Sequence, residues 1–269
     1  MIIIITAIVI ASMHFGRTEE FGVEETKSKN FTLIDTTNEY FNNFPKSGFK
    51  PKLNDSSRDA RFDEETCAGV CICTLSSPMV LIVDCSRAGI EPDLFELLRN
   101  HKFPVPEGGE VRVVIMSSEL VFLNNGIFST LGLTQMHVKY NHGLSIISRS
   151  VFNASSSSLR VLDLRNNNLT HFPLGTLNGL ENLEFLSLDD NKISLIPEWM
   201  SNVTSLIHLS LANNKIASIS EGGLTKLENL RFLDLHNNEL RTLPAPLSHL
   251  SNLRTLIIWG NPIISLPSG

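Results

Sequence analysis

The spacing of hydrophobic residues in the second half of the chain repeats about every two dozen positions. Five segments carry the pattern Leu-x-x-Leu-x-Leu-x-x-Asn-x-Leu, with isoleucine at some positions: 159–169, 183–193, 206–216, 230–240 and 253–263. Their asparagines follow one another at steps of 24, 23, 24 and 23 residues. Recurrence of this kind predicts a repeat protein in which each unit forms one coil of a solenoid.

Within each copy two apolar residues stand two positions apart, as Leu186 and Leu188 do. In an extended strand such residues point to the same side, so stacked units form a parallel sheet with an apolar inner face. Each buried leucine contributes about 2 kcal/mol, and one unit alone cannot bury its leucines. The sequence therefore predicts an α/β-type repeat solenoid. It is curved, with short parallel strands on the concave side and mostly irregular segments on the convex side.

The asparagines of the repeats have a structural explanation. Each follows a short strand, where the chain turns and leaves backbone groups that no strand pairing satisfies. A buried asparagine offers two donors and a carbonyl, so it can bond the backbone on both sides of the turn. Six of them stand in register and are predicted to form a ladder: Asn141, Asn167, Asn191, Asn214, Asn238 and Asn261.

Two weaker copies precede the five strong ones. In the later of them Leu133, Met136, Val138 and Asn141 fit the pattern, with one extra residue before Leu144. The earlier one has an acidic residue where asparagine is expected, and it consists of Val111, Val114, Met116 and Glu119. These copies extend the predicted repeats over residues 111–269, about seven units, and no cysteine follows Cys85 to form a C-terminal cap.

The first 66 residues differ from the rest. Residues 1–12 contain a short apolar run ending in small residues, which predicts a secretory signal peptide; a buried strand is the alternative. Residues 17–66 hold 11 acidic and 8 basic side chains and no sustained apolar period. We therefore expect residues 13–66 to be a polar, disordered segment, either a spacer or a partner-binding tail.

All four cysteines lie close together, spaced as Cys67-x3-Cys71-x-Cys73-x11-Cys85. An even number of clustered cysteines behind a signal peptide predicts disulfides. A zinc site is the alternative, but the C-x-C pair and the absence of nearby histidines fit it poorly. We assign residues 67–110 to a disulfide-stapled N-terminal cap. The spacing alone permits three pairings.

Composition narrows the function. With 28 acidic and 22 basic residues the net charge is −6, which argues against a nucleic-acid partner. No later stretch is long and apolar enough to span a membrane. The chain lacks His-Glu-x-x-His, Gly-x-Ser-x-Gly and phosphate-loop motifs, so we expect no enzyme activity, no cofactor and no metal site. His137, His208 and His236 fall on strands but in different columns of the sheet.

The residues that alternate with the buried leucines face the concave side and are the candidates for binding. Aromatic side chains are enriched in interface hot spots, and we expect those at 185, 232 and 259 to be exposed. Packing along the sheet, with no partner, is the other interpretation. The predicted partner-binding residues are Arg165, Phe185, Asp189, His208, Phe232, Asp234, His236 and Trp259.

Five Asn-x-Ser/Thr sequons favour N-glycosylation of a secreted chain. Two of them, at 168 and 202, are expected in turns or return segments, where a glycan could project outward. The predicted glycosylation sites are Asn30, Asn54, Asn153, Asn168 and Asn202.

On the repeats and the cysteine cluster ending in Val83-Asp84-Cys85-Ser86, the chain resembles the extracellular leucine-rich-repeat family. The resemblance covers residues 67–269 and implies a leucine-rich-repeat horseshoe with a cysteine-rich N-terminal cap. Among subfamilies the chain is most similar to the small leucine-rich proteoglycans or to part of a receptor ectodomain. That resemblance implies disulfides Cys67–Cys73 and Cys71–Cys85. The x11 spacing and the absence of later cysteines depart from the proteoglycan pattern.

The functional expectation follows from these points. We expect a secreted, extracellular protein that binds another protein or a matrix component through its concave face. Two alternatives are a noncatalytic accessory subunit of a secreted enzyme and a truncated ectodomain of a leucine-rich-repeat receptor. The identity of the ligand is not encoded in the repeat pattern, because concave faces of this kind recognise many unrelated partners.

Overall fold

The computed structural model describes residues 71–265, except 77–78, 87–90, 101, 104, 106, 172–174, 176 and 178. The side chains of residues 91–93, 199 and 201 are also left out of the description. The predicted signal peptide, the predicted polar segment, Cys67, Asn30 and Asn54 therefore lie outside the described residues.

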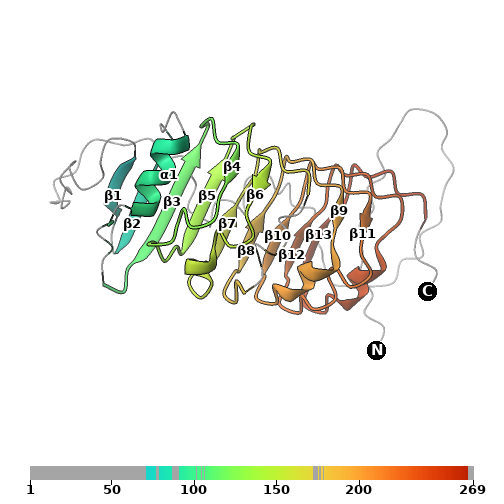
Figure 1. Cartoon of the computed structure of the whole chain (residues 1–269). Coiled ribbons are helices and arrows are strands. Elements are labelled where there is room, and N and C mark those ends of the chain that lie inside the picture. The colour runs from blue at the N-terminus through green and yellow to red at the C-terminus, as the bar shows by residue number, and fades with distance from the viewer. Residues whose placement is uncertain are drawn as a thin grey trace, which may run out of the picture. The chain divides into compact units, whose positions relative to one another are not determined.

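The described part begins with a small cap. Strands β1 (Ile72–Ser76) and β2 (Val80–Asp84) pair antiparallel, and helix α1 (Glu91–Asn100) follows (Figure 1). A disulfide joins Cys71 to Cys85 at the open end of the hairpin, which confirms this half of the implied pairing. Cys73 is also disulfide-bonded. Because β2 pairs parallel with the first strand of the solenoid, the cap continues the main sheet.

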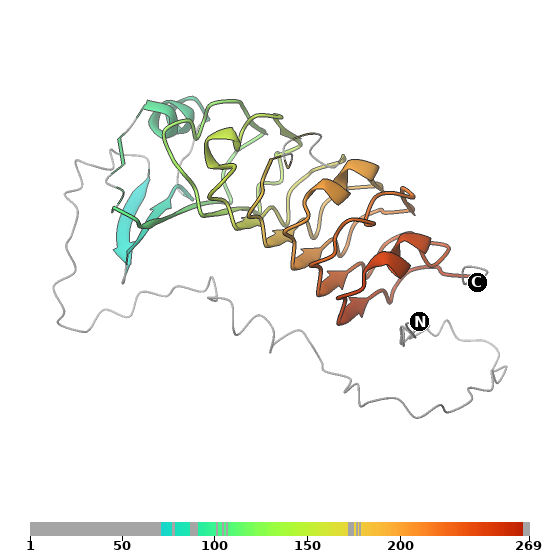
Figure 2. The same ribbon diagram turned by 90° about the horizontal axis from the view of Figure 1, so that it is seen from below.

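The solenoid is built on one sheet with the strand order β1-β2-β3-β5-β7-β8-β10-β12-β13. From β2 onward every neighbouring pair is parallel. The strands line the concave side, and the return segments form the opposite side (Figures 1 and 2). This confirms the predicted curved repeat solenoid. Its seven strands are β3 (Glu110–Met116), β5 (Gln135–Lys139), β7 (Val161–Asp163), β8 (Phe185–Ser187), β10 (His208–Ser210), β12 (Phe232–Asp234) and β13 (Thr255–Ile257).

The register of β3 differs by one residue from the predicted one. Val113 lies opposite Met136 and Ile115 opposite Val138, and all four are fully buried. The repeat pattern carried by Val111, Val114 and Met116 predicts that Val114 and Met116 point inward, and this prediction is wrong. A shift of one residue turns every side chain to the other face of the sheet. The mistake arose because residues 111–116 are apolar at nearly every position, so the alternation that reveals the buried face is missing.

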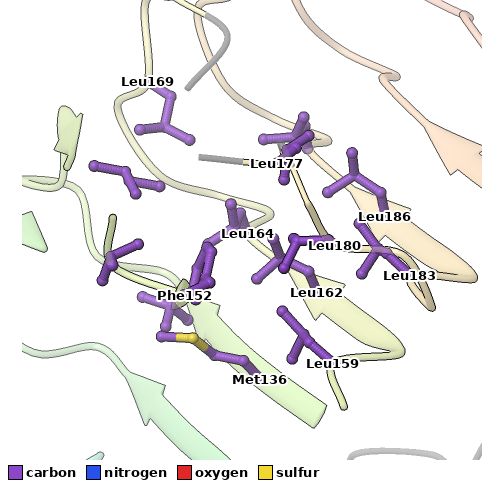
Figure 3. Close-up of a cluster of buried hydrophobic side chains, with 14 of the residues drawn as sticks. Met136, Phe152, Leu159, Leu162, Leu164, Leu169, Leu177, Leu180, Leu183 and Leu186 are labelled. Atoms are coloured by element: carbon purple, nitrogen blue, oxygen red, sulfur yellow. The ribbon is translucent and has the colours of Figure 1, made fainter. Parts of the chain in front are cut away.

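Leucines from successive coils form the core. Leu162, Leu164 and Leu186 are fully buried between the sheet and the return segments, and Phe152 packs beside them from a return segment (Figure 3). Leu188 is fully buried as well. Their burial continues without a break from coil to coil. Neighbouring coils thus supply the apolar surroundings that a single unit of two dozen residues lacks.

The return segments are short and varied. Some contain a brief second ladder: β4 (Phe122–Leu123) pairs with β6 (Ile146–Ile147), and β9 (Leu195–Ile196) pairs with β11 (Ser218–Ile219). Three return segments contain a short 3₁₀ helix, two of them after β6 and β9. These helices are η2 (Asn153–Ser155), η3 (Glu198–Asn202) and η4 (Ala245–His249).

The six repeat asparagines connect neighbouring coils. Asn191 Nδ2 donates to the Leu188 carbonyl of its own coil at 3.0 Å and to the Leu164 carbonyl of the preceding coil at 3.0 Å. Its Oδ1 accepts the Leu169 N–H at 3.0 Å. The same pattern, an amide shared between two coils and a carbonyl that accepts from the coil before, is found at Asn141, Asn167, Asn214, Asn238 and Asn261.

The residue before each ladder position has a positive φ. This is the left-handed conformation, which asparagine, aspartate and glycine tolerate best. It lets the chain turn sharply out of the strand and aim the next side chain into the coil. The residues concerned are Tyr140, Asn166, Asp190, Asn213, Asn237 and Gly260, and Ser117 has the same conformation after β3, where Ser118 follows it.

Candidate binding surface

Parallel register places residues from successive strands side by side across the concave face. The strand position that begins β8, β10 and β12 carries Phe185, His208 and Phe232. Their rings stack, with centroids 4.6 Å apart between Phe185 and His208 and 4.1 Å apart between His208 and Phe232. We call these three residues the aromatic column.

The aromatic column is buried, and this corrects the expectation of exposed phenylalanines. Phe185, His208 and Phe232 are 7, 6 and 8% exposed. The reason is geometric: strands lie about 4.8 Å apart, which is close to the separation of stacked rings, so each ring covers the faces of its neighbours. These three rings therefore pack against one another along the sheet, which is the alternative interpretation given for the aromatic residues.

Burial also changes the acid–base behaviour of His208. Desolvation, together with the nearby positive charge of Arg165, lowers the pKa of His208 to about 4 from an ordinary value of 6.5. Protonation would place a charge between two phenylalanine rings, out of contact with bulk water. His208 is therefore neutral in the folded protein at physiological pH.

We expect this pKa shift to make stability fall in acid. Unfolded His208 takes up a proton as the pH drops through 6.5, whereas the folded residue does so only near 4, so stability is lost between these values. The loss at pH 4 is about 3 kcal/mol relative to a His208→Phe variant, which keeps the stack and cannot titrate. Urea unfolding of both proteins at pH 7 and pH 4 measures it. A difference between the two proteins that does not change with pH would contradict the assignment.

A cluster of charges surrounds Asp163 in the N-terminal half of the concave face. The Asp163 carboxylate lies 2.8 Å from Arg165 Nε, 3.5 Å from Lys139 Nζ and 3.5 Å from His137 Nδ1. Burial acts to raise the pKa of Asp163. The contact with His137 Nδ1 and the charges of Arg165 and Lys139 outweigh it and hold that pKa well below its usual range. Asp163 is therefore ionised and neutralises part of the basic charge around it.

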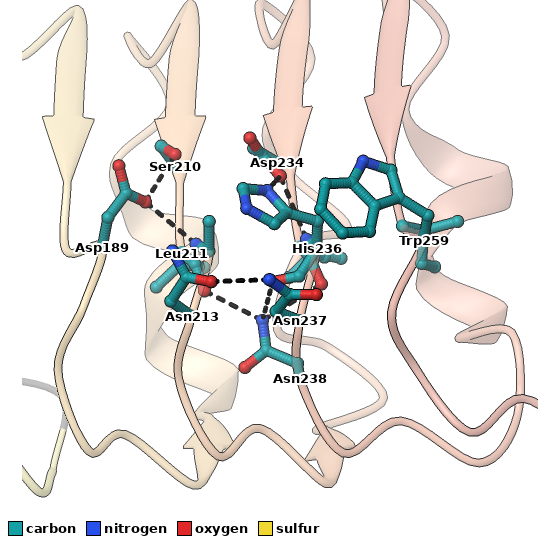
Figure 4. Close-up of polar contacts among 12 residues, drawn as sticks. Asp189, Ser210, Leu211, Asn213, Asp234, His236, Asn237, Asn238 and Trp259 are labelled. Atoms are coloured by element: carbon teal, nitrogen blue, oxygen red, sulfur yellow. Dashed lines mark hydrogen bonds and ion pairs between the residues drawn. The ribbon is translucent and has the colours of Figure 1, made fainter. Parts of the chain in front are cut away.

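Asp189 lies one coil further on and is held mainly by neutral donors. Its carboxylate accepts a hydrogen bond from the Ser210 hydroxyl at 2.5 Å (Figure 4). It also accepts from the Ser187 hydroxyl at 2.9 Å and the Ala212 N–H at 2.9 Å. Burial raises the pKa of Asp189, although the two hydroxyl hydrogen bonds and Arg165 act to lower it. These bonds fix the carboxylate at the floor of the concave face.

An aromatic pair occupies the C-terminal half of the face. The indole of Trp259 stacks on the imidazole of His236 with ring centroids 4.6 Å apart and 19° between the planes. Asp234 holds the imidazole through a contact of 2.7 Å to Nδ1 (Figure 4). Burial acts to lower the pKa of His236, but the hydrogen bond and charge of Asp234 outweigh it and raise that pKa above its usual value.

Trp259 is 47% exposed, unlike the aromatic column. Arg165, Asp189 and His236 are half-buried, so their side chains also reach the surface of the concave face. The indole, its imidazole partner and the carboxylate that holds this imidazole form one group, which we call the Trp259 patch. It consists of Asp234, His236 and Trp259.

A second set of polar residues, which the repeat pattern had not singled out, links the coils at the start of the strands. Asn182 Nδ2 donates to the Ser157 carbonyl at 2.8 Å, and Asn229 Nδ2 to the Thr204 carbonyl at 2.9 Å. Asn252, Ser205 and Ser158 make the equivalent bonds. The signal was present in the sequence, because each stands directly before the first leucine of a repeat.

A shallow depression beside this second ladder is lined by Glu184, Ile207, Arg231 and their neighbours, with a volume of about 220 Å³. Pockets that hold small ligands usually measure about 300–1,000 Å³ and are mainly apolar. This depression does not favour a small-molecule function.

Three predicted glycosylation sites lie in the described part. Asn153 is exposed at the start of η2, and Asn202 is exposed at the end of η3. Asn168 is half-buried, and its N–H donates to the Leu144 carbonyl at 2.8 Å. All three follow or belong to return segments, away from the Trp259 patch.

The described residues contain neither a cluster of metal ligands nor a membrane-spanning helix. In residues 71–265, as far as they are described, no three histidine, cysteine, aspartate or glutamate side chains come together to hold a metal ion. His137, His208 and His236 occupy different positions across the sheet. Across that same stretch, no helix has the length and apolar character needed to cross a bilayer.

Comparison with known proteins bears on the repeats. Residues 132–193 match the family described as "Leucine rich repeat", and residues 204–249 and 228–268 match "Leucine Rich repeats (2 copies)". This is a leucine-rich-repeat protein. The leucine-rich-repeat chain has no match among curated proteins.

Among solved structures, the leucine-rich-repeat chain is similar to "Crystal structure of TLR13-ssRNA13 complex", with a TM-score of 0.54 and 24% identity. The match covers 70% of this chain and 29% of that chain, so the present chain spans less than a third of its length. The likeness is one of fold. Leucine-rich repeats are a scaffold for interactions, and no catalytic family is found.

Proposed function

We propose that this leucine-rich-repeat protein is secreted and binds another protein, or a protein of the extracellular matrix, through its concave face. The observation that carries the proposal is Trp259, a large aromatic side chain that is 47% exposed on a sheet otherwise well packed. Tryptophan is among the residues most enriched in binding hot spots. His236 stacks on it, and Arg165 and Asp189 add polar groups further along the same face, after β7 and β8. The aromatic column and Asp234 are buried in that face.

Secretion is supported by two features. The Cys71–Cys85 disulfide is of a kind that persists in oxidising compartments. Asn153 and Asn202 are exposed sequons outside the concave face, so glycans there would leave the ligand surface open. We propose glycans at Asn153, Asn168 and Asn202, together with the sequons at Asn30 and Asn54.

A protein ligand is favoured over a nucleic acid. The solved complex with a similar fold contains ssRNA13. This chain, however, carries 28 acidic against 22 basic residues and a net charge of −6, whereas binding to phosphates requires a basic surface. The similarity of fold does favour a second candidate within the same class, a portion of a receptor ectodomain. Sequencing the transcript through its 3′ coding end distinguishes the two, since a receptor continues into a membrane span.

The proposal predicts a loss of binding when the indole is removed. The full chain is expressed in secretory eukaryotic cells and screened against displayed cell-surface and matrix proteins. We expect Trp259→Ala to weaken binding of the ligand identified in this screen roughly thirtyfold. This corresponds to about 2 kcal/mol of binding free energy, as for a hot-spot residue. Leu195→Ala is the matched control, because Leu195 is 43% exposed on β9, outside the nine-stranded sheet.

Two results would contradict the proposal. If the chain remains inside the cells with its sequons unmodified, secretion is wrong. If Trp259→Ala and Arg165→Ala bind the ligand as tightly as the unchanged protein while Leu195→Ala does not, the concave face is not the binding surface.

A further inference from the structure

The three residues of the Trp259 patch form a chain of contacts that ends at the exposed indole (Figure 4). Asp234 Oδ1 lies 2.7 Å from His236 Nδ1 and also accepts the His236 backbone N–H at 3.0 Å. The imidazole in turn stacks on the indole of Trp259. Asp234 is buried, His236 is half-buried and Trp259 is 47% exposed. The contacts therefore connect the interior of the concave face to the side chain on which the proposed function depends.

The contact with Asp234 determines which nitrogen of His236 titrates. An ionised carboxylate only accepts hydrogen bonds, so Nδ1 carries a proton and donates to Asp234, and Nε2 is the nitrogen that gains or loses the second proton. With this proton, the bond to Asp234 is charge-assisted and the imidazolium attracts the face of the indole. Loss of the proton weakens both contacts that hold the indole.

The strands on either side of His236 place uncharged side chains beside it. β10 and β13 are the two neighbours of β12 in the sheet. Their register brings Ala212 and Trp259 level with His236, and neither of these side chains titrates. The charge of His236 is therefore set by groups on its own strand and further along the face.

The charged groups that act on His236 are aspartates. Burial acts to lower the pKa of His236, but the hydrogen bond and charge of Asp234 and the charges of Asp189 and Asp190 outweigh it and raise that pKa above 6.5. Arg165, the next basic group in the same row of the face, lies three strand spacings away and bonds a carboxylate of its own coil at 2.8 Å. The imidazolium is present below the raised pKa and is lost as the pH rises through it.

We propose that Asp234 and His236 are positioning residues for Trp259: the charged imidazole fixes the indole in its binding orientation, so the protein ligand binds less tightly once His236 loses its proton. This inference rests on the proposed function and adds a dependence on pH to it. The physical reason is preorganisation, because an indole that is already held loses less conformational entropy when a ligand covers it.

The first measurement follows the indole itself in the full chain. The chain contains two tryptophans, and Trp199→Phe leaves Trp259 as the remaining one. A protonated imidazole stacked on an indole quenches its fluorescence, so we expect the emission of this variant to rise between pH 6 and pH 9. The midpoint should lie above 6.5 and should move to lower pH when Asp234→Asn is added. Adding His236→Phe, which keeps a ring on the indole and cannot titrate, should abolish the rise.

The second measurement follows binding of the protein ligand identified in the screen with displayed cell-surface and matrix proteins. We expect its affinity for the unchanged chain to fall about three- to tenfold between pH 6 and pH 9, as for the loss of one cation–π contact. The fall is measured relative to His236→Phe, because titration of groups in the ligand affects both proteins alike. His236→Gln, which has neither ring nor charge, should bind weakly at both pH values.

The outcomes separate this inference from the proposed function. A fluorescence change that persists in His236→Phe, or an equal fall in affinity for the unchanged chain and for His236→Phe, overturns the positioning role. The proposed function then still stands if Trp259→Ala weakens the protein ligand. If the fluorescence follows His236 but Trp259→Ala leaves binding unchanged, the proposed function fails and the positioning role fails with it.

Discussion

Replacing Asn191 with alanine is expected to lower the free energy of unfolding by about 4 kcal/mol. The side chain is buried and serves two coils at once, since Nδ2 donates to Leu164 and Leu188 and Oδ1 accepts from Leu169. Alanine leaves the Leu169 N–H without this partner in an interior that water does not reach, whereas the Leu164 carbonyl keeps its bond from Asn167 Nδ2 at 2.7 Å. An unsatisfied buried group costs about 1–3 kcal/mol, and each of the two lost amide bonds contributes about 1 kcal/mol more.

Urea unfolding followed by far-ultraviolet circular dichroism measures this loss. Asn182→Ala is the matched control, because Asn182 also bonds a carbonyl of the preceding coil, Ser157, but does so at the exposed edge of the sheet. Its cost should be less than about 1 kcal/mol, since water can replace the lost bond. Equal losses in the two variants would show that the asparagines at the strand ends are not the main link between coils.

The second large effect concerns the charge cluster around Asp163. We expect Asp163→Ala to cost about 3–5 kcal/mol, because it removes the carboxylate that lies between Lys139, Arg165 and His137 while the basic groups stay. Removing one member of a buried ion pair lowers the free energy of unfolding more than replacing both members with apolar residues does. The measured quantity is again the free energy of unfolding in urea.

A double variant separates charge from packing. Lys139 and Asp163 are both buried, so Lys139→Met with Asp163→Leu removes one positive and one negative charge and fills the space with apolar atoms. We expect the double variant to be at least about 2 kcal/mol more stable than Asp163→Ala. Raising the salt concentration should change the deficit of Asp163→Ala little, because buried charges are poorly screened. A double variant no more stable than Asp163→Ala would mean that packing, and not charge, dominates.

The architecture was readable in the sequence because the repeat imposes it. Each strong copy places leucines two apart and an asparagine three residues later, as at Leu186, Leu188 and Asn191, and these side chains occupy the predicted sides of the coil. A position that is buried in every unit is apolar at the same point of each repeat. The period in the sequence therefore predicts its burial without information on the neighbouring coil. The cap gave a weaker signal, because a hairpin and a helix that occur once have no period.

The concave face could be predicted as a set of residues but not as a surface. Phenylalanine at 185 and 232 is equally compatible with an exposed hot spot and with a buried ring, so residue type alone does not predict exposure. Both rings are buried because His208 stacks between them from the intervening strand. The exposure of Trp259 depends in the same way on what lies beside it in space.

Periodicity along the chain therefore establishes which residues enter the coil, since that is a property of one strand and its turn. The exposure of an outward residue, its pKa and its ion partners are properties of side chains two dozen residues apart that the stacking of coils brings within a few ångströms. The register of β3 also depends on neighbouring strands. Residues 111–116 are apolar on both faces, and pairing with β2 and β5 determines which face is buried.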